Sequence, residues 1–233
     1  MKYYFNWNGT SCGTKGIMLQ SMPEIIRPEE RINHIIIPGR PGELTQLEGE
    51  YIYNSYIQTI PLIIYTESAV REAEQWLQGD GYVTFSGQPD LKQRARVINA
   101  VTFRKHSRNS NWWEGEVQFY CEPLKAAVST EENIEVTTSG ATVTNPGDVD
   151  AKPRIEITGS GDITFQMGGS ALILTGVTSG MVVDSDTEWV LKNGAPQQGI
   201  YTGKFPVLKP GDNTVAFTGS VTKLTITPRW RYL

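Results

Sequence analysis

The chain has 233 residues, of which 39% are hydrophobic and 20% are charged, and its formal net charge is −4. This composition is ordinary for a folded globular protein and excludes an intrinsically disordered chain. The acidic balance argues against a dedicated nucleic-acid-binding protein, because phosphate backbones favour clustered Lys and Arg.

The first part of the chain predicts short strands joined by tight turns. The aromatic run Tyr3–Trp7 ends at Asn8-Gly9, a dipeptide typical of hairpin turns. The apolar run His34–Ile37 stops at Pro38–Gly42, where two prolines and two glycines in five residues indicate a rigid loop. Tyr51–Tyr65 is expected to be a further extended region.

One amphipathic helix is expected after these strands. Thr66 supplies an N-cap, and apolar residues then recur at helical spacing from Ala69 to Leu77. Gly79–Gly81 is expected to end the helix. A single helix among strands has to lie against a sheet to bury its apolar stripe.

Strands are predicted again over Tyr82–Phe85, Arg94–Phe103 and Glu116–Cys121, with a polar loop or hairpin end at Ser107–Trp113. The small, polar and acidic segment Ala126–Asn133 indicates a linker. The sequence therefore predicts two domains, residues 1–125 and residues 126–233.

The second domain is Thr/Val/Gly-rich and predicts only strands. Turn signals recur every ~8–12 residues, the spacing of a β-sandwich or jelly roll. Gly159–Gly161 is interpreted as a hairpin turn that needs positive φ. The expected strands are Ile134–Thr138, Ala141–Asn145, Pro153–Thr158, Asp162–Gln166, Ala171–Thr175, Met181–Asp184, Glu188–Lys192, Gly211–Phe217 and Val221–Pro228.

Groups able to carry catalysis are scarce. His34 adjoins an apolar strand, where a structural role is favoured over a catalytic one. A glycosidase would need a carboxylate pair, but turn chemistry accounts for the candidates. These candidates are Asp148, Asp150, Asp184, Asp186 and Glu188. We therefore assign no catalytic, metal-binding or cofactor-binding residue and expect a protein that is not an enzyme.

Cys12 and Cys121 are the only cysteines. A disulfide between them is one alternative, and two free thiols in a reducing cytoplasm is the favoured one. Residues 1–10 lack the apolar centre of a signal peptide, and no stretch approaches the ~20 apolar residues of a membrane span. We expect synthesis and folding in the cytosol, without membrane association.

Two surface features leave alternatives open. The basic residues of Lys92–Arg96, together with Arg104, Lys105 and Arg108, could meet nucleic acid, but a polar strand face or an interface with an acidic neighbour is favoured. Trp189 could stack on a sugar or contact a protein partner, because Trp suits both roles.

The ordered motifs resemble the distal tail protein (Dit) family of long, non-contractile-tailed phages. Each motif is weak alone, and their order along nearly the whole chain carries the resemblance. They are Ile37–Gly42, the helix ending at Trp76-Leu77, Phe119–Pro123, Asn145–Asp148, Lys152–Ile155, Gly159–Ile163, Asp184–Asp186, Gly203–Pro206, Leu208–Asn213 and Pro228–Leu233.

The resemblance implies a tail-tube-like β-sandwich or barrel with one flanking α-helix, followed by a galectin-like or carbohydrate-module-like β-sandwich. It implies six copies in a ring that joins the tail tube protein to the tail-tip or tail-associated protein of a phage or prophage. Receptor-binding proteins or fibres would attach outside, and DNA would pass through the lumen without specific binding. The location implied is the virion tail, with assembly in the host cytoplasm and no cofactor.

A contact within such a ring is predicted at the stiff loop formed by Pro38, Gly39, Arg40, Pro41 and Gly42, and along Leu44–Gln58. Two prolines lower the entropy cost of docking the loop. The alternative function is that of a carbohydrate-binding module that recognises a host surface glycan through Trp189. A polysaccharide hydrolase is the least supported reading.

Overall fold

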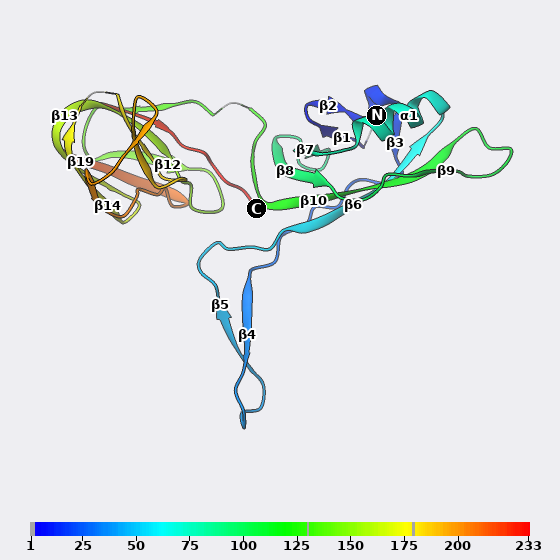
Figure 1. Ribbon diagram of the computed structural model, residues 1–233, viewed down its shortest axis with the longest axis horizontal. Helices are drawn as coiled ribbons and strands as arrows, with labels where there is room; N and C mark the ends of the chain where they lie inside the picture. The colour runs from blue at the N-terminus through cyan, green and yellow to red at the C-terminus, as the bar shows by residue number, and fades with distance from the viewer. Residues whose placement is uncertain (1–2, 130, 179) are drawn as a thin grey trace. The chain divides into compact units, whose positions relative to one another are not determined.

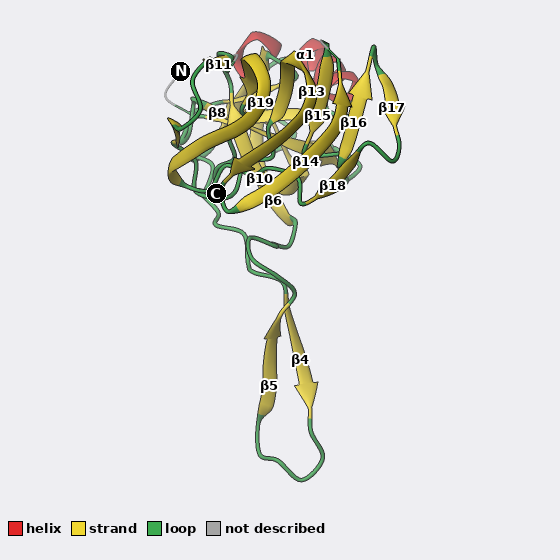
Figure 2. Cartoon of the chain, turned by 90° about the vertical axis from the view of Figure 1, so that its left-hand side faces the viewer, coloured by secondary structure: helices red, strands yellow, loops and turns green. Residues whose placement is uncertain are grey.

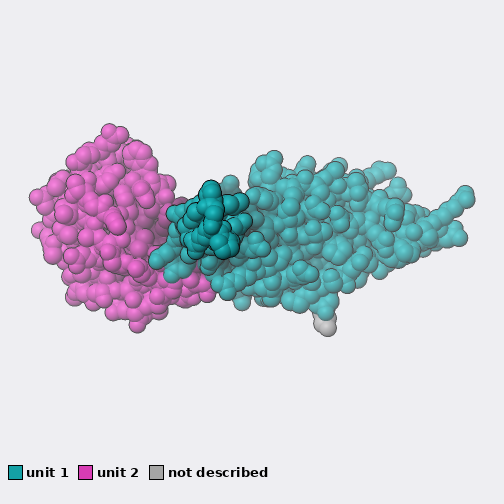
Figure 3. All heavy atoms as spheres, turned by 90° about the horizontal axis from the view of Figure 1, so that it is seen from below, with its two compact units in different colours: residues 1–128, 233 teal, residues 129–232 magenta. Residues whose placement is uncertain are grey.

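A computed structural model describes residues 3–129, 131–178 and 180–233, and within them it is mainly β with one α-helix (Figure 1). The mainly β fold expected from the composition is confirmed. The chain divides into two compact units, residues 1–128 with Leu233 (unit 1) and residues 129–232 (unit 2), coloured separately in Figure 3. Each unit has its own hydrophobic core.

Unit 1 is built on an antiparallel sheet in the order β2-β1-β7-β8-β10-β6-β3, with β9 also paired to β10. A 3-10 turn, η1 (Cys12–Lys15), follows β2. The strands of this sheet are β1 (Phe5–Trp7), β2 (Thr10–Ser11), β3 (Ile17–Leu19), β6 (Tyr56–Ile64), β7 (Asp80–Phe85), β8 (Leu91–Val97), β9 (Phe103–Lys105) and β10 (Trp113–Ala127). The Asn8-Gly9 turn between β1 and β2 has positive φ at both residues, which confirms the hairpin prediction.

The helix α1 (Glu67–Trp76) closes the core of unit 1. Its N-cap is Thr66, whose hydroxyl accepts a hydrogen bond from the Ala69 N–H at 3.4 Å, as expected from the sequence. Trp76 stacks on Phe5 of β1 with ring centroids 5.7 Å apart. The amphipathic stripe therefore meets the apolar face of the sheet.

The predicted strand boundaries of unit 1 need three corrections. Arg94–Phe103 is not one strand, because β8 ends at Val97 and β9 starts at Phe103. β10 extends far beyond the predicted Glu116–Cys121, and its last residues, Ala126 and Ala127, pair with β8 instead of starting a linker. Helix α1 already ends at Trp76, so Asp80 and Gly81 belong to β7.

Unit 2 consists of strands only among its described residues, in the order β11-β19-β13-β15-β16-β17. In addition, β12 pairs with β19, and β14 pairs with both β13 and β18. The strands are β11 (Ile134–Val136), β12 (Ala141–Asn145), β13 (Arg154–Met167), β14 (Ser170–Val177), β15 (Met181–Asp184), β16 (Trp189–Lys192), β17 (Ala195–Gln197), β18 (Tyr201–Gly203) and β19 (Gly211–Thr227).

Gly161 has the predicted positive φ, at +82°, but the prediction of a hairpin turn at Gly159–Gly161 is wrong. These residues lie within the continuous strand β13, where the pairing with β19 shifts register. Gly219 of β19 has φ +98°, and a Cβ there would lie 2.3 Å from the carbonyl oxygen of Asp162. The glycines therefore mark bulges where two long strands bend together. The expected strands Pro153–Thr158 and Asp162–Gln166 merge into β13, and Gly211–Phe217 and Val221–Pro228 merge into β19. The first half of β13 pairs with β15 and its second half with β14, whereas β19 pairs with β12 and then with β11.

Candidate interaction surfaces

The predicted contact loop Pro38–Gly42 is the tip of a hairpin formed by β4 (Ile32–Ile36) and β5 (Glu43–Leu47). Figure 2 shows β4 and β5 as a separate two-stranded ribbon outside the larger sheets. Gly39 and Gly42 both have φ near +80°, and the Arg40 N–H donates to the Ile37 carbonyl at 3.1 Å. The loop is thus a tight turn, exposed along its whole length.

Both faces of this hairpin carry exposed apolar side chains. Ile32 is paired with Leu47 on one face, and Ile35 is paired with Leu44 on the other. Ile36 is 75% exposed and Leu47 is 56% exposed. A two-stranded hairpin that buries neither face is marginal in water, so this one lacks the covering layer that stabilises the other strands.

Polar contacts at the base of the hairpin join its two arms to each other. The Arg31 N–H donates to the Ile52 carbonyl at 2.9 Å, and the Arg31 guanidinium lies 3.8 Å from the Glu48 carboxylate. Tyr53 and Gln58 are buried within the unit. Only the first part of the predicted contact segment Leu44–Gln58 therefore forms a continuous exposed stretch, from residue 44 to residue 52.

Trp189, the predicted glycan or partner contact, begins β16 directly after the turn that follows β15. Its side chain is 38% exposed, and in the β15–β16 pairing it lies opposite Asp184. The Asp184 carboxylate accepts hydrogen bonds from the backbone N–H groups of Asp186 and Thr187, which confirms the turn interpretation of this motif.

Asp184 also holds the end of the chain in place. The Arg229 guanidinium donates to both of its carboxylate oxygens, at 2.7 and 2.9 Å. This bidentate pair, with the backbone N–H groups, lowers the pKa of Asp184 below its ordinary value. A carboxylate held in this way is a structural anchor of the β15–β16 turn, since both its oxygens are occupied.

The remaining chemical candidates gain little support. Within residues 3–129, 131–178 and 180–233, no three His, Cys, Asp or Glu side chains are grouped to hold a metal ion. His34 lies 3.2 Å from Glu43 across the exposed hairpin, and His106 stacks on Trp112 with ring centroids 4.2 Å apart.

In the described part of the chain, no helix is long and apolar enough to span a membrane.

Cys12 and Cys121 are free thiols, both buried in the core of unit 1, in agreement with the favoured expectation. Burial raises the pKa of Cys121 to about 12, because the apolar surroundings disfavour the thiolate. The thiol therefore stays protonated and packs as a small hydrophobic group.

Part of the basic segment is paired within its own sheet. Arg94 lies 3.6 Å from Glu122, and Arg96 lies 3.5 Å from Asp80, all on neighbouring strands. Lys105 lies 5.5 Å from the centre of the Trp113 ring. These contacts favour the reading as a polar strand face over a nucleic-acid surface.

Comparison with known proteins identifies a shared fold through structure, not through sequence. No protein-family model matches the chain, and no curated protein sequence matches it significantly. A solved structure does match: SPP1 Dit (gp 19.1), described as a paradigm of the hub adsorption apparatus in phages that infect Gram-positive bacteria. The match covers 99% of both chains at 19% identity, with a TM-score of 0.76. The chain therefore has the fold of SPP1 Dit along nearly its whole length.

Proposed function

We propose that this protein is a structural, non-enzymatic distal tail protein of a phage or prophage, a member of the Dit family. The observation that carries the proposal is the fold shared with SPP1 Dit over 99% of both chains, which includes both units. The SPP1 protein belongs to a hub adsorption apparatus. We assign the same place to this chain, at the junction of the tail tube and the tail tip.

The proposed assembly is a hexameric ring held in part by the β4–β5 hairpin. Its apolar side chains face solvent on both sides, and they would be covered by a neighbouring copy. A contact between two different surfaces of identical subunits repeats head to tail, and it forms a ring when the rotation from copy to copy closes. The Pro38–Gly42 turn, with exposed residues 44–52, would supply one of these two surfaces.

The proposed position also defines the partners. Tail tube protein would bind one face of the ring and the tail-tip or tail-associated protein the other, with receptor-binding proteins or fibres attached outside. DNA would pass through the lumen without specific binding. The protein would reside in the virion tail after assembly in the host cytoplasm.

The ring contact is tested with Ile36→Ser and Leu47→Ser in one chain, against Ile173→Ser as the matched control. Ile173 is 46% exposed on β14 and lies outside the hairpin. Proteins co-expressed with the tail tube and tail-tip proteins are examined by native mass spectrometry and negative-stain microscopy. We expect hexameric rings for the unmodified chain and the control, and folded monomers for the hairpin variant.

Two outcomes contradict different parts of the proposal. Rings that persist in the hairpin variant, or after deletion of Pro38–Gly42, would show that the hairpin is not a ring contact. An unmodified chain that joins neither itself nor any tail protein would contradict the proposed function as a whole.

Glycan binding is a second candidate function, favoured by the partly exposed indole of Trp189 at the start of β16. An exposed Trp provides a flat apolar face on which a sugar ring can stack. A glycan array probed with the unmodified protein and with Trp189→Ala tests this function. Binding that is lost without a change in melting temperature supports it, and an array without any signal contradicts it.

A further inference from the structure

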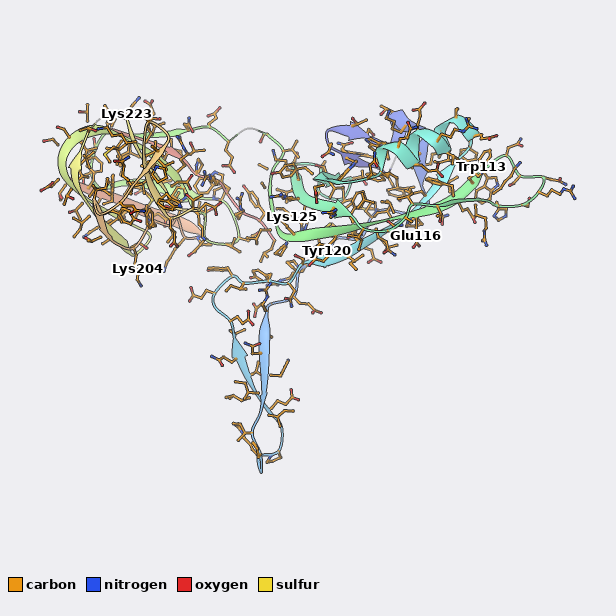
Figure 4. The ribbon with its side chains drawn as sticks, viewed as in Figure 1. Trp113, Glu116, Tyr120, Lys125, Lys204 and Lys223 are labelled. Atoms are coloured by element: carbon orange, nitrogen blue, oxygen red, sulfur yellow. The ribbon has the colours of Figure 1, made fainter. Side chains whose placement is uncertain are left out.

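Unit 2 contains a surface hollow of about 490 Å³ that belongs neither to the β4–β5 hairpin nor to the Trp189 side chain. Polar and aromatic residues from separate segments line it, among them Lys152, Ser185, Glu188, Tyr201, Lys204 and Phe205. Figure 4 labels Lys204 at the surface of this unit.

The hollow lies where backbone hydrogen bonds join distant segments. The Ser185 N–H donates to the Pro153 carbonyl at 3.1 Å, and the Lys204 N–H donates to the Ala171 carbonyl at 2.9 Å. Gly203 has φ +108°, and a Cβ there would lie 2.3 Å from the Ala171 carbonyl oxygen. Its walls are therefore held by strand pairing and close backbone packing, so the site is pre-formed.

Ser185 provides the first sign of a ligand. Its side chain is only 2% exposed, and its hydroxyl has no hydrogen-bond partner among the described residues. Burying a hydroxyl without a partner costs free energy, so folded proteins rarely retain one. Ser185 lines the hollow, and the Asp184–Arg229 pair holds the adjoining turn in place.

The charges that line the hollow provide the second sign. Lys152 and Lys204 are both exposed, and within the described part of the chain neither has a carboxylate within 4.0 Å. Two lysines that line the same hollow as Ser185 favour an anionic group such as phosphate or carboxylate. Glu188 has φ +56°, a backbone conformation uncommon for a residue with a side chain, and its carboxylate can accept hydrogen bonds from hydroxyl groups.

The aromatic wall identifies the rest of the ligand. Tyr201 and Phe205 are half-buried and meet edge to face, with ring centroids 5.3 Å apart. Aromatic rings of this kind pack against the C–H face of a sugar, while hydroxyl groups reach polar side chains. We propose that this hollow binds a sugar unit bearing a phosphate or carboxylate group. The inference concerns unit 2 alone and does not depend on ring assembly.

The experiment is a titration of the full chain with four probes: glucose 1-phosphate, glucuronate, glucose and inorganic phosphate. Amide shifts in ¹H–¹⁵N spectra report the binding site and the affinity of each probe. We expect the two anionic sugars to shift the amides of Ser185, Glu188 and Lys204. Glucose and inorganic phosphate should bind about tenfold more weakly or worse, because each lacks half of the recognised chemistry.

Three variants locate the site. Lys152→Ala combined with Lys204→Ala should weaken binding of glucose 1-phosphate by about tenfold or more, whereas Lys209→Ala, another exposed lysine of unit 2, should not change it. Ser185→Ala should weaken binding without lowering the melting temperature, because it removes an unpaired buried hydroxyl.

Each contrary result is decisive. Equal binding of glucose and glucose 1-phosphate, or of inorganic phosphate and glucose 1-phosphate, would overturn the ligand assignment. Shifts confined to other parts of the chain would overturn the site, as would a double lysine variant with unchanged affinity and melting temperature. Absence of binding by all four probes would overturn the proposal while leaving the tail function untouched.

Discussion

The β4–β5 hairpin and the β13–β19 pair are both antiparallel and both rich in β-branched residues, yet their surroundings are opposite. On β13, the side chains of Ile155 and Ile157 are fully buried in the hydrophobic core of unit 2. On β4, Ile32 and Ile36 face solvent, and no third strand joins the hairpin in the described part of the chain. Strand-forming residues therefore do not determine burial, which depends on a second layer.

This difference has a functional meaning. The β13–β19 pair completes its core within one chain, so its apolar residues stabilise the fold. The hairpin leaves comparable residues without a cover, and we propose that they stabilise a contact with another copy of the chain. Substitutions in the two regions should therefore separate effects on stability from effects on assembly.

The largest expected effect comes from truncating the same residue type in both regions. Ile155→Ala should lower the free energy of unfolding of unit 2 by about 2–5 kcal/mol, because it removes buried methyl groups and leaves a cavity. Ile36→Ala should change it by less than about 0.5 kcal/mol, because the side chain is already in water. Urea unfolding followed by circular dichroism and tryptophan fluorescence measures both changes. Similar losses in the two variants would refute the comparison.

An intermediate effect is expected at the Asp184–Arg229 pair of unit 2. Asp184→Asn should lower the free energy of unfolding by about 1–3 kcal/mol at neutral pH, since the partly buried guanidinium loses its bidentate partner. Lys209→Gln is a suitable control, because this exposed residue of unit 2 lies outside the β13–β15 pairing and has no ion pair among the described residues. Thermal unfolding of the two variants measures the difference.

The pH dependence of this pair follows from the lowered pKa of Asp184. The carboxylate contributes its stabilisation above its unfolded pKa, about 3.9, and loses it as the pH falls toward the lower folded pKa. Melting temperatures measured from pH 7 to pH 2 should therefore fall less steeply below about pH 4 in Asp184→Asn than in the unmodified chain. Parallel curves would show that another group governs acid unfolding.

The smallest effect is expected within the hairpin. His34 and Glu43 lie 3.2 Å apart across β4 and β5, and both side chains are at least half exposed. Glu43→Gln should change the free energy of unfolding by less than about 0.5 kcal/mol, since polar contacts between exposed side chains contribute little to stability. A chemical denaturation curve is sufficient to check this. If the free energy of unfolding fell by more than about 1 kcal/mol, the hairpin would contribute to the stability of unit 1 even without a partner molecule.

Several local features were predictable because neighbouring residues alone determine them. Thr66 caps the helix through its own hydroxyl, and Asn8-Gly9 tolerates the positive φ of a hairpin turn. Asp184 binds the backbone of the residues that follow it. Such interactions span only a few residues, so the sequence pattern is enough to identify them.

Other features could not be read from the pattern. Gly159–Gly161 has the composition of a turn, but pairing with β19 on both sides of the irregularity keeps β13 extended through a bulge. The short strands β17 and β18 escaped prediction because edge pairing with β16 and β14, not intrinsic propensity, makes them strands.

The same division applies to function. By itself, the sequence determined the mainly β class, the capped helix, the stiff Pro38–Gly42 loop and the scarcity of catalytic groups, because each follows from residue type and short-range spacing. Only the tertiary structure decided that this loop forms the end of a hairpin that no other strand covers. It also decided that Lys152, Ser185 and Lys204 line one hollow. Exposure and convergence depend on which distant segments pack together, and that is a property of the whole fold.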